Sequence, residues 1–185
     1  MSPTIKKRIN LHTLGPSNTN CENAARHWAK STGNDVNITL HSRLETAISV
    51  MKDEPGESYL LGCAVYPDLH EIVFNNLDWL IFDDSFVIPT LEMVLATRQD
   101  LTLADINTVY THPAPASLVN DYQIFLASSN SSAAKHCSDG ESDGCMTTIT
   151  SVLAHNLKVL KSFGEINMCF TIHKKREMAT ADEQY

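Results

Sequence analysis

The sequence has few positive charges and lacks any long apolar run. Lys and Arg total 14 against 22 Asp and Glu, so the formal net charge is -8 at pH 7. A nucleic-acid-binding protein needs a basic face for the phosphates, and this balance argues against that class. No apolar stretch approaches the roughly 20 residues of a membrane-spanning helix. The basic residues Lys6–Arg8 are not followed by the apolar region of a secretory signal.

Cysteine is present, but not in the pattern of a disulfide framework. The five cysteines are odd in number and widely spaced, with no C-x-x-C pair. Such a pattern is typical of reduced thiols in a protein of the cytoplasm. We therefore expect a cytoplasmic protein without structural disulfides.

The motifs of several enzyme classes are also missing. There is no G-x-S-x-G, no P-loop and no G-x-G-x-x-G, so nothing in the sequence indicates a hydrolase, a nucleotide site or a dinucleotide site. The eight histidines do not cluster at metal-ligand spacing, and His70-Glu71 lacks the second histidine of H-E-x-x-H. We expect no metal site.

Strand patterns and helix patterns alternate regularly along the sequence. Residues 9–65 read as strand, helix, strand, helix, strand, and the apolar run "YLLGCAV" at 59–65 is typical of a strand covered on both faces. Residues 77–98 hold two or more strands in succession. A second strand and helix series follows over residues 103–157, with a last strand at 167–173. The polar tail from Lys174 onward has no apolar periodicity and predicts a frayed end.

Two strand and helix series joined by consecutive strands predict an α/β protein with two lobes and a ligand cleft between them. We place the first lobe at residues 1–88 together with 163–185, and the second at 89–162. From the length of 185 residues we expect no separate regulatory domain of much size.

Three strand-to-helix junctions are rich in small polar residues: Gly15–Asn20, Thr111–Pro115 and Ser128–Ser132. In open α/β sheets ligands bind beyond the carboxyl ends of the strands, where helix N-termini favour anions. A small carboxylate is therefore the expected ligand.

A purely structural interpretation of the same residues stays open. Thr19 and Glu22 form a T-x-x-E capping box, so Thr19 has a role in its own helix whether or not a ligand binds. Serine and asparagine are common helix caps in the junction at 128–132 as well. His112 is equally compatible with a hydrogen-bonded surface or core histidine.

These junctions resemble the prephenate dehydratase family, and among its members the non-aromatizing prephenate decarboxylases of the bacilysin and aeruginosin pathways. "TLGPSNTNCENAA" is similar to the dehydratase pattern L-G-P-x-G-T-F-S-x-x-A-A, with Asn18, Asn20 and Cys21 as departures. "YTHPAPASLV" resembles S-H-P-Q-A-L, in the His-Pro-x-Pro form that the decarboxylases show. "SNSSAAKHCSDGESDGCMTT" and "LKVLKSFGEINMCFTIHKK" resemble decarboxylase segments. The resemblance covers nearly the whole chain and implies a type 2 periplasmic-binding-like fold.

The departures from the family separate two activities. Dehydratases carry N-x-T-R-F near the end, whose threonine assists loss of the ring hydroxyl, whereas Asn167–Phe170 has neither the threonine nor the arginine. The P-x-E-N-S segment is replaced by "CAVYPDLHE". The resemblance then implies decarboxylation of prephenate without loss of the hydroxyl, giving dihydro-4-hydroxyphenylpyruvate as a building block for a non-ribosomal peptide or antibiotic.

The resemblance also implies roles for individual residues. His112 is expected to donate a proton to the ring or to bind a carboxylate, because an unperturbed imidazole transfers protons near neutral pH; Thr111 is the second catalytic candidate. The expected substrate-binding residues are Gly15, Pro16, Ser17, Asn18, Thr19, Asn20, Asn130, Ser131, Ser132 and Asn167.

The expected partner is prephenate alone, with no metal or organic cofactor, no nucleic acid and no membrane; a homodimer is left open. Two alternatives remain. One is a true dehydratase giving phenylpyruvate, in which His112 or Thr148 replaces the missing acid. The other is a non-catalytic domain that binds a small carboxylate, since fold does not determine function. Product identity tests the first, and binding without turnover identifies the second.

Overall fold

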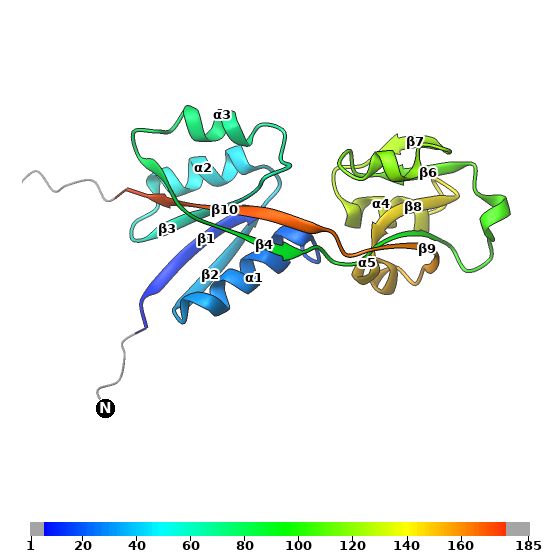
Figure 1. Ribbon diagram of the computed structural model, residues 1–185, viewed down its shortest axis with the longest axis horizontal. Coiled ribbons are helices and arrows are strands. Elements are labelled where there is room, and N and C mark those ends of the chain that lie inside the picture. The colour runs from blue at the N-terminus through cyan, green and yellow to red at the C-terminus, as the bar shows by residue number, and fades with distance from the viewer. Residues whose placement is uncertain (1–5, 177–185) are drawn as a thin grey trace, which may run out of the picture. The chain divides into compact units, whose positions relative to one another are not determined.

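The computed structural model describes residues 6–176, which form two α/β units (Figure 1). One unit extends to Gly15 and includes Cys21–Ile88 and the chain from Met168 onward; the other consists of Pro16–Asn20 and Pro89–Asn167. This division differs from the expected lobe limits at residues 16–20 and 163–167. Within the described range, no helix combines the length and the apolar character needed to cross a membrane.

The first unit is a five-stranded sheet in the order β2-β1-β3-β10-β4. β1 runs parallel to β2 and β3, whereas β10 runs antiparallel to β3. The strands are β1 (Arg8–Leu14), β2 (Asp35–His41), β3 (Ser58–Cys63), β4 (Leu80–Pro89) and β10 (Asn167–Lys175), and the helices are α1 (Asn20–Thr32), α2 (Leu44–Asp53) and α3 (Leu69–Phe74).

Helices cover both faces of this sheet. On one face, Leu11 of β1 packs in a core cluster with Ala25 and Trp28 of α1. On the other face, Leu60 of β3 packs with Met51 of α2 and residues of α3. β3 is buried along nearly its whole length for this reason, as its apolar run predicted.

The second unit is a five-stranded sheet in the order β7-β6-β8-β5-β9. β6 is parallel to β7 and β8, and β5 is antiparallel to β8 and β9. The strands are β5 (Met93–Thr97), β6 (Thr108–Thr111), β7 (Gln123–Leu126), β8 (Gly144–Thr148) and β9 (Lys158–Gly164). The helices are α4 (Asn130–Ser138) and α5 (Ile149–Ala154), with 3-10 turns η1 (Leu103–Asp105) and η2 (Ala116–Val119).

The predicted α/β class and the two-unit organisation are confirmed, while some elements differ. β9 was not predicted, because two register shifts against β5 break its apolar alternation. The helix expected near Pro115 is only the short 3-10 turn η2.

The frayed end expected from Lys174 is wrong for the first two residues, since β10 continues to Lys175. The Lys175 ammonium donates hydrogen bonds to the carbonyls of Met51, Lys52 and Glu54 at 2.8, 2.9 and 2.7 Å. It thereby closes the carboxyl end of α2, where backbone carbonyls lack partners within the helix. Residues 177–185 of the predicted tail lie outside the described residues.

Candidate functional site

Three parallel strands of the second unit end at one edge of its sheet. Because β7, β6 and β8 run in the same direction, the residues that follow them lie along that edge: His112 after β6, the start of α4 after β7, and Thr148 at the end of β8. β5 runs the opposite way and pairs Met93 with Thr148, so its first residue lies there too. The structure therefore brings His112 to the same edge as Asn130–Ser132.

His112 is a half-buried histidine whose ring is oriented by its own segment. The backbone N–H of Ala114 donates to Nδ1 at 3.2 Å, so the neutral ring carries its hydrogen on Nε2. Burial lowers the pKa of His112 below its usual value of 6.5. At neutral pH the side chain is thus an uncharged imidazole with an N–H donor at Nε2.

Thr111 is fully buried, and its hydroxyl holds the chain just after β6. Oγ1 donates to the carbonyl of His112 at 2.9 Å, and the carbonyl of Thr111 accepts from the N–H of Ala127 at 2.9 Å. These bonds fasten the His112 segment to the end of β7. Thr111 therefore holds the backbone of His112 in place.

α4 begins with a well-formed cap. The hydroxyl of Ser129 accepts the N–H of Ser132 at 3.0 Å, which is the standard arrangement at a helix N-terminus. The carbonyl of Asn130 accepts from the hydroxyl of Thr147 at 2.7 Å, which ties the first turn of the helix to β8.

The side-chain amide of Asn130 is less fully bonded. Its Nδ2 lies 4.0 Å from the sulfur of Met93, and its Oδ1 is buried without a hydrogen-bond partner among residues 6–176. The amide therefore keeps hydrogen-bonding capacity at the N-terminus of α4, beside the positive end of the helix dipole.

Three hydroxyl side chains lie close together at the end of β8, and only one of them, Thr148, was predicted as a candidate, as the replacement acid of a dehydratase. Oγ1 of Thr148 lies 3.0 Å from Oγ1 of Thr150 and 3.1 Å from Oγ of Ser151. Thr148 and Ser151 are buried. The pattern that marks this group in the sequence is "TTITS" at 147–151, which begins with the last two residues of β8.

The Gly15–Asn20 loop is shaped mainly by backbone constraints. The N–H of Gly15 donates to the carbonyl of His41 at 2.7 Å, and a Cβ at Gly15 would lie only 3.2 Å from Cβ of Leu40. Asn18 adopts a left-handed φ of 66°, which asparagine tolerates better than most residues. Thr19 donates its hydroxyl to the carbonyl of Pro16 at 2.9 Å.

The remaining predicted residues lie apart or are engaged elsewhere. Oδ1 of Asn20 accepts the N–H of Leu91 at 2.8 Å. Pro16, Ser17 and Asn167 are exposed, and Asn167 is the first residue of β10. Gly15 belongs to the first unit, whereas all the other predicted site residues belong to the second.

The first unit contains a buried polar chain that the sequence did not reveal. Nδ1 of His12 lies 2.9 Å from Nε2 of His41, and Nε2 of His12 lies 2.8 Å from Oε2 of Glu54. The hydroxyl of Ser58 donates to the same carboxylate oxygen at 2.9 Å. Burial, reinforced by the nearby His12, lowers the pKa of His41. This hydrogen-bonded group holds the side chain of His41, and the backbone carbonyl of His41 accepts the N–H of Gly15.

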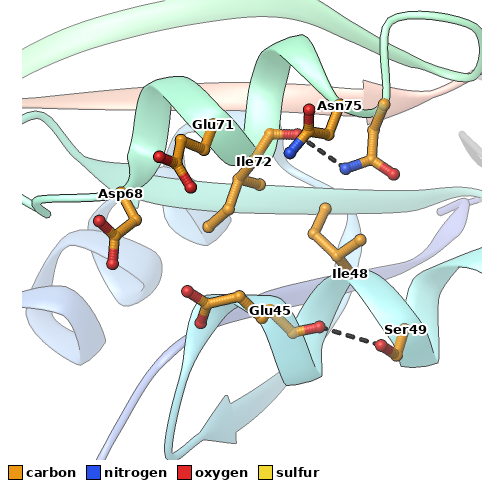
Figure 2. A pocket seen from close by; sticks show the side chains of 8 residues that line it. Glu45, Ile48, Ser49, Asp68, Glu71, Ile72 and Asn75 are labelled. Atoms are coloured by element: carbon orange, nitrogen blue, oxygen red, sulfur yellow. Dashed lines mark hydrogen bonds between the residues drawn. The ribbon is translucent and has the colours of Figure 1, made fainter.

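A cavity of about 270 Å³ in the first unit lies between α2 and α3 (Figure 2). Figure 2 shows the carboxylates of Glu45, Asp68 and Glu71 around it. The Arg43 guanidinium, which donates to Glu45 at 3.2 Å, holds the pKa of Glu45 below its usual 4.5. Because a wall with three acidic side chains disfavours anions, this cavity does not suit the small carboxylate expected from the sequence.

Within the part of the chain that the structure describes, no three His, Cys, Asp or Glu side chains are grouped to hold a metal ion. All five cysteines are free thiols.

Curated relatives resemble the chain over nearly its whole length. It is 28% identical to a prephenate decarboxylase from Bacillus amyloliquefaciens over 188 residues, which cover 95% of this chain and 91% of the relative. It is 26% identical, with the same coverage, to a prephenate decarboxylase from Bacillus subtilis strain 168. No protein-family model matches the chain.

Solved structures share the fold. A prephenate dehydratase from Arthrobacter aurescens, solved in complex with L-Phe, superposes with a TM-score of 0.68 at 18% identity, covering 91% of this chain. This chain spans only 61% of the length of that dehydratase. A periplasmic VFT2 domain of BvgS from Bordetella pertussis superposes with a TM-score of 0.54 at 15% identity, covering 90% of this chain and 80% of that domain. The resemblance predicted from the motifs is thus confirmed, together with the periplasmic-binding-like fold.

Proposed function

From this likeness to prephenate decarboxylases we propose that the protein removes carbon dioxide from prephenate without aromatizing the ring and releases dihydro-4-hydroxyphenylpyruvate. The observation that carries the proposal is the similarity to decarboxylases over 95% of the chain. The segment Asn167–Phe170, which lacks the threonine and arginine of the dehydratase motif, supports decarboxylation over dehydration.

The donors at the edge of the second sheet suit a dicarboxylate. The protein carries a formal net charge of -8, so an anionic substrate must be held by local donors against an unfavourable overall field. The N–H groups at the N-terminus of α4, the Nδ2 amide nitrogen of Asn130 and the Nε2–H of His112 supply such donors. We propose Asn130, Ser131 and Ser132 as carboxylate-binding residues.

The loop before α1 is the second proposed binding segment, with unequal roles within it. Ser17, Asn18 and Thr19 are proposed to contact the substrate. Gly15 shapes the loop through its close approach to Leu40. For Pro16, Asn20 and Asn167, substrate contact stays a prediction.

The chemistry needs a proton at a ring carbon and no acid at the ring hydroxyl. When the bond to the ring carboxylate breaks, its electron pair moves through the adjacent double bond to a ring carbon, which then takes up a proton. If an acid reaches the hydroxyl first, water leaves and the ring becomes aromatic. The enzyme must therefore place its acid so that the ring carbon, and not the ring hydroxyl, receives the proton.

His112 is the proposed proton donor. It is neutral at pH 7 in the unliganded protein because burial lowers its pKa. A dianion bound beside the ring raises the pKa again, since an opposite charge favours the imidazolium. The imidazolium proton then passes to the ring carbon. Thr111 is proposed as a positioning residue, through its hydrogen bond to the His112 carbonyl.

This chemistry requires neither a metal nor an organic cofactor, because the ring diene itself accepts the electron pair. We further propose a cytoplasmic enzyme of secondary metabolism that supplies an antibiotic or non-ribosomal peptide building block; the free thiols agree with a reducing compartment.

The test is to incubate the purified protein with prephenate at neutral pH and to follow carbon dioxide release and the product by proton NMR. A product that keeps its ring sp³ carbon and hydroxyl, formed with carbon dioxide, supports the proposal. Phenylpyruvate above the spontaneous background indicates a dehydratase. Saturable binding without turnover indicates a carboxylate-binding domain.

A further inference from the structure

Two cysteines of the first unit lie on the same face of its sheet. Cys21 is in the first turn of α1 and, like Ala25 and Trp28, is buried in the core cluster between α1 and the sheet. Cys63 is the last residue of β3, and its partner on β10 is Phe170, a buried member of the same cluster. Because paired residues of neighbouring strands point to the same face, Cys63 faces α1 as well.

The side chains of Cys21 and Cys63 are hydrogen-bonded to each other. The Thr13 hydroxyl lies within hydrogen-bonding range of Cys21, and it donates to the carbonyl of Leu61, two residues before Cys63, at 3.0 Å. The backbone N–H of Val65 reaches Cys63 from the turn after β3. The packing of α1 on β1 and β3 thus brings the two thiols into one small cluster.

The two thiols differ in acidity and in exposure. Cys21 donates its S–H to the Cys63 sulfur and the Val65 N–H donates there too, so the pKa of Cys63 falls from 9.0 to about 7 although burial opposes the change. The same hydrogen bond, together with burial, raises the pKa of Cys21 well above 9.0. Cys21 is buried, whereas Cys63 is half-buried. Near neutral pH Cys63 is therefore the thiolate that a small oxidant meets first.

The other three cysteines provide internal comparisons. Cys137 and Cys145 of the second unit are also hydrogen-bonded to each other, but both are fully buried. Cys169 of β10 is half-buried like Cys63, and its sulfur donates to a carbonyl, that of Phe170, at 4.0 Å. Cys63 thus combines partial exposure with a neighbouring thiol.

We propose that Cys21 and Cys63 form a redox switch that hydrogen peroxide closes into a disulfide. The Cys63 sulfur attacks one peroxide oxygen, the O–O bond breaks and hydroxide leaves, which gives a sulfenic acid at Cys63. The Cys21 sulfur then attacks the Cys63 sulfur, the S–O bond breaks, and the departing hydroxide takes the Cys21 proton to form water. The two thiols together lose two electrons, and peroxide is reduced to water.

The disulfide acts on the loop before α1. Cys21 lies at the end of the Gly15–Asn20 loop, so a bond to Cys63 replaces a hydrogen bond by a covalent link between this loop and β3. The same loop contains residues that we propose to contact the substrate. The switch goes beyond the proposed decarboxylation and does not depend on it, because it concerns only the thiols of the chain.

The experiment treats the reduced full chain with hydrogen peroxide at pH 7, alkylates the remaining thiols and maps the peptides by mass spectrometry. We expect a linked pair of peptides that contain Cys21 and Cys63, the loss of two of the five free thiols, and the recovery of both with dithiothreitol. Hydrogen exchange at the backbone amides of residues 16–20 should be slower in the oxidised protein.

Three variants separate the roles of the cysteines. Cys21→Ser should accumulate a sulfenic acid at Cys63, which dimedone captures, because the second thiol is gone. Cys63→Ser should leave Cys21 reduced. Cys169→Ser is the matched control, since it removes a half-buried thiol of the same sheet, and it should form the disulfide as the unmodified protein does.

Failure to form the link between Cys21 and Cys63, whether Cys63 stays reduced or is oxidised further, would overturn the proposal. A disulfide between other cysteines, or unchanged hydrogen exchange at residues 16–20 once the link has formed, would overturn it too. Because peptide mapping of the unmodified protein needs no variant, it decides the matter even where a substitution prevents folding.

Discussion

The side-chain oxygen of Asn20 accepts a hydrogen bond of 2.8 Å from the backbone N–H of Leu91, 71 positions further along the chain. The bond ties the end of the Gly15–Asn20 loop to the segment before β5, and both residues group with the second unit. Asn20 was predicted to bind the substrate. The geometry gives its oxygen a structural partner, and substrate contact stays a prediction.

Asn20→Ala should therefore lower the free energy of unfolding by about 1 kcal/mol, since it leaves the Leu91 N–H without its acceptor. Asn20→Asp keeps an acceptor oxygen and should lose less. Urea unfolding of both variants measures the difference. An alanine variant as stable as the unmodified protein would contradict the structural role.

His112→Asn tests the proposed proton donor. The asparagine oxygen can still accept the Ala114 N–H in place of Nδ1, while the donor at Nε2 is removed. We expect kcat for carbon dioxide release to fall by about 10²–10⁴-fold, the range typical of a general acid. The unfolding free energy, measured in urea as the control, should change little. Unaltered turnover would exclude His112 as the proton donor.

The pH dependence of kcat/KM tests the protonation state of His112. Burial lowers its pKa below 6.5, so the free protein at pH 7 holds little imidazolium. The protonated fraction grows as the pH falls, and kcat/KM should rise toward the acid side until the pH reaches that pKa. Initial rates, corrected for spontaneous reaction of prephenate, measure the profile. A flat profile would favour a hydrogen-bonding role.

Stability should decrease on the acid side of pH 6.5. Burial lowers the pKa of His41, His112 and His173 in the folded chain, whereas the unfolded chain titrates near 6.5. The unfolded state then binds more protons, so this stability is fully present above pH 6.5 and is lost as the pH falls through 6.5 toward the folded pKa values. Urea unfolding between about pH 5.5 and 7.5 measures how the free energy of unfolding changes with pH. His173→Gln should make the unfolding free energy less dependent on pH. An unchanged pH dependence would show that His173 does not contribute to it.

Lys175→Met should destabilise the fold by about 1–2 kcal/mol, because three carbonyls at the end of α2 lose a charged donor while the alkyl chain is kept. Lys175→Arg retains the charge and should recover part of the loss. Thermal unfolding of the two variants provides the comparison. If Lys175→Met unfolded at the same temperature as the unmodified protein, the stability of the end of α2 would not depend on Lys175.

Local patterns predicted most of the strands and helices because they depend on neighbouring residues. The apolar run at 59–65 became the buried β3, and the alternation in β1 and β2 was enough to place both strands. Where long-range pairing overrides the local pattern, prediction failed. β9 is irregular because its register shifts against β5.

Of the candidate site, the sequence by itself determined the strand-to-helix junctions, with their small polar residues, and the family resemblance that these residues carry. Their chemical surroundings were decided only by the tertiary structure. The pairing of strands and helices buries the Thr111 hydroxyl and joins His12 to Glu54 across 42 positions. Among residues 6–176 it leaves the Asn130 side-chain oxygen without a hydrogen-bond partner. Burial and long-range hydrogen bonds determine which side chains are still free to act on a substrate, and no local periodicity contains that information.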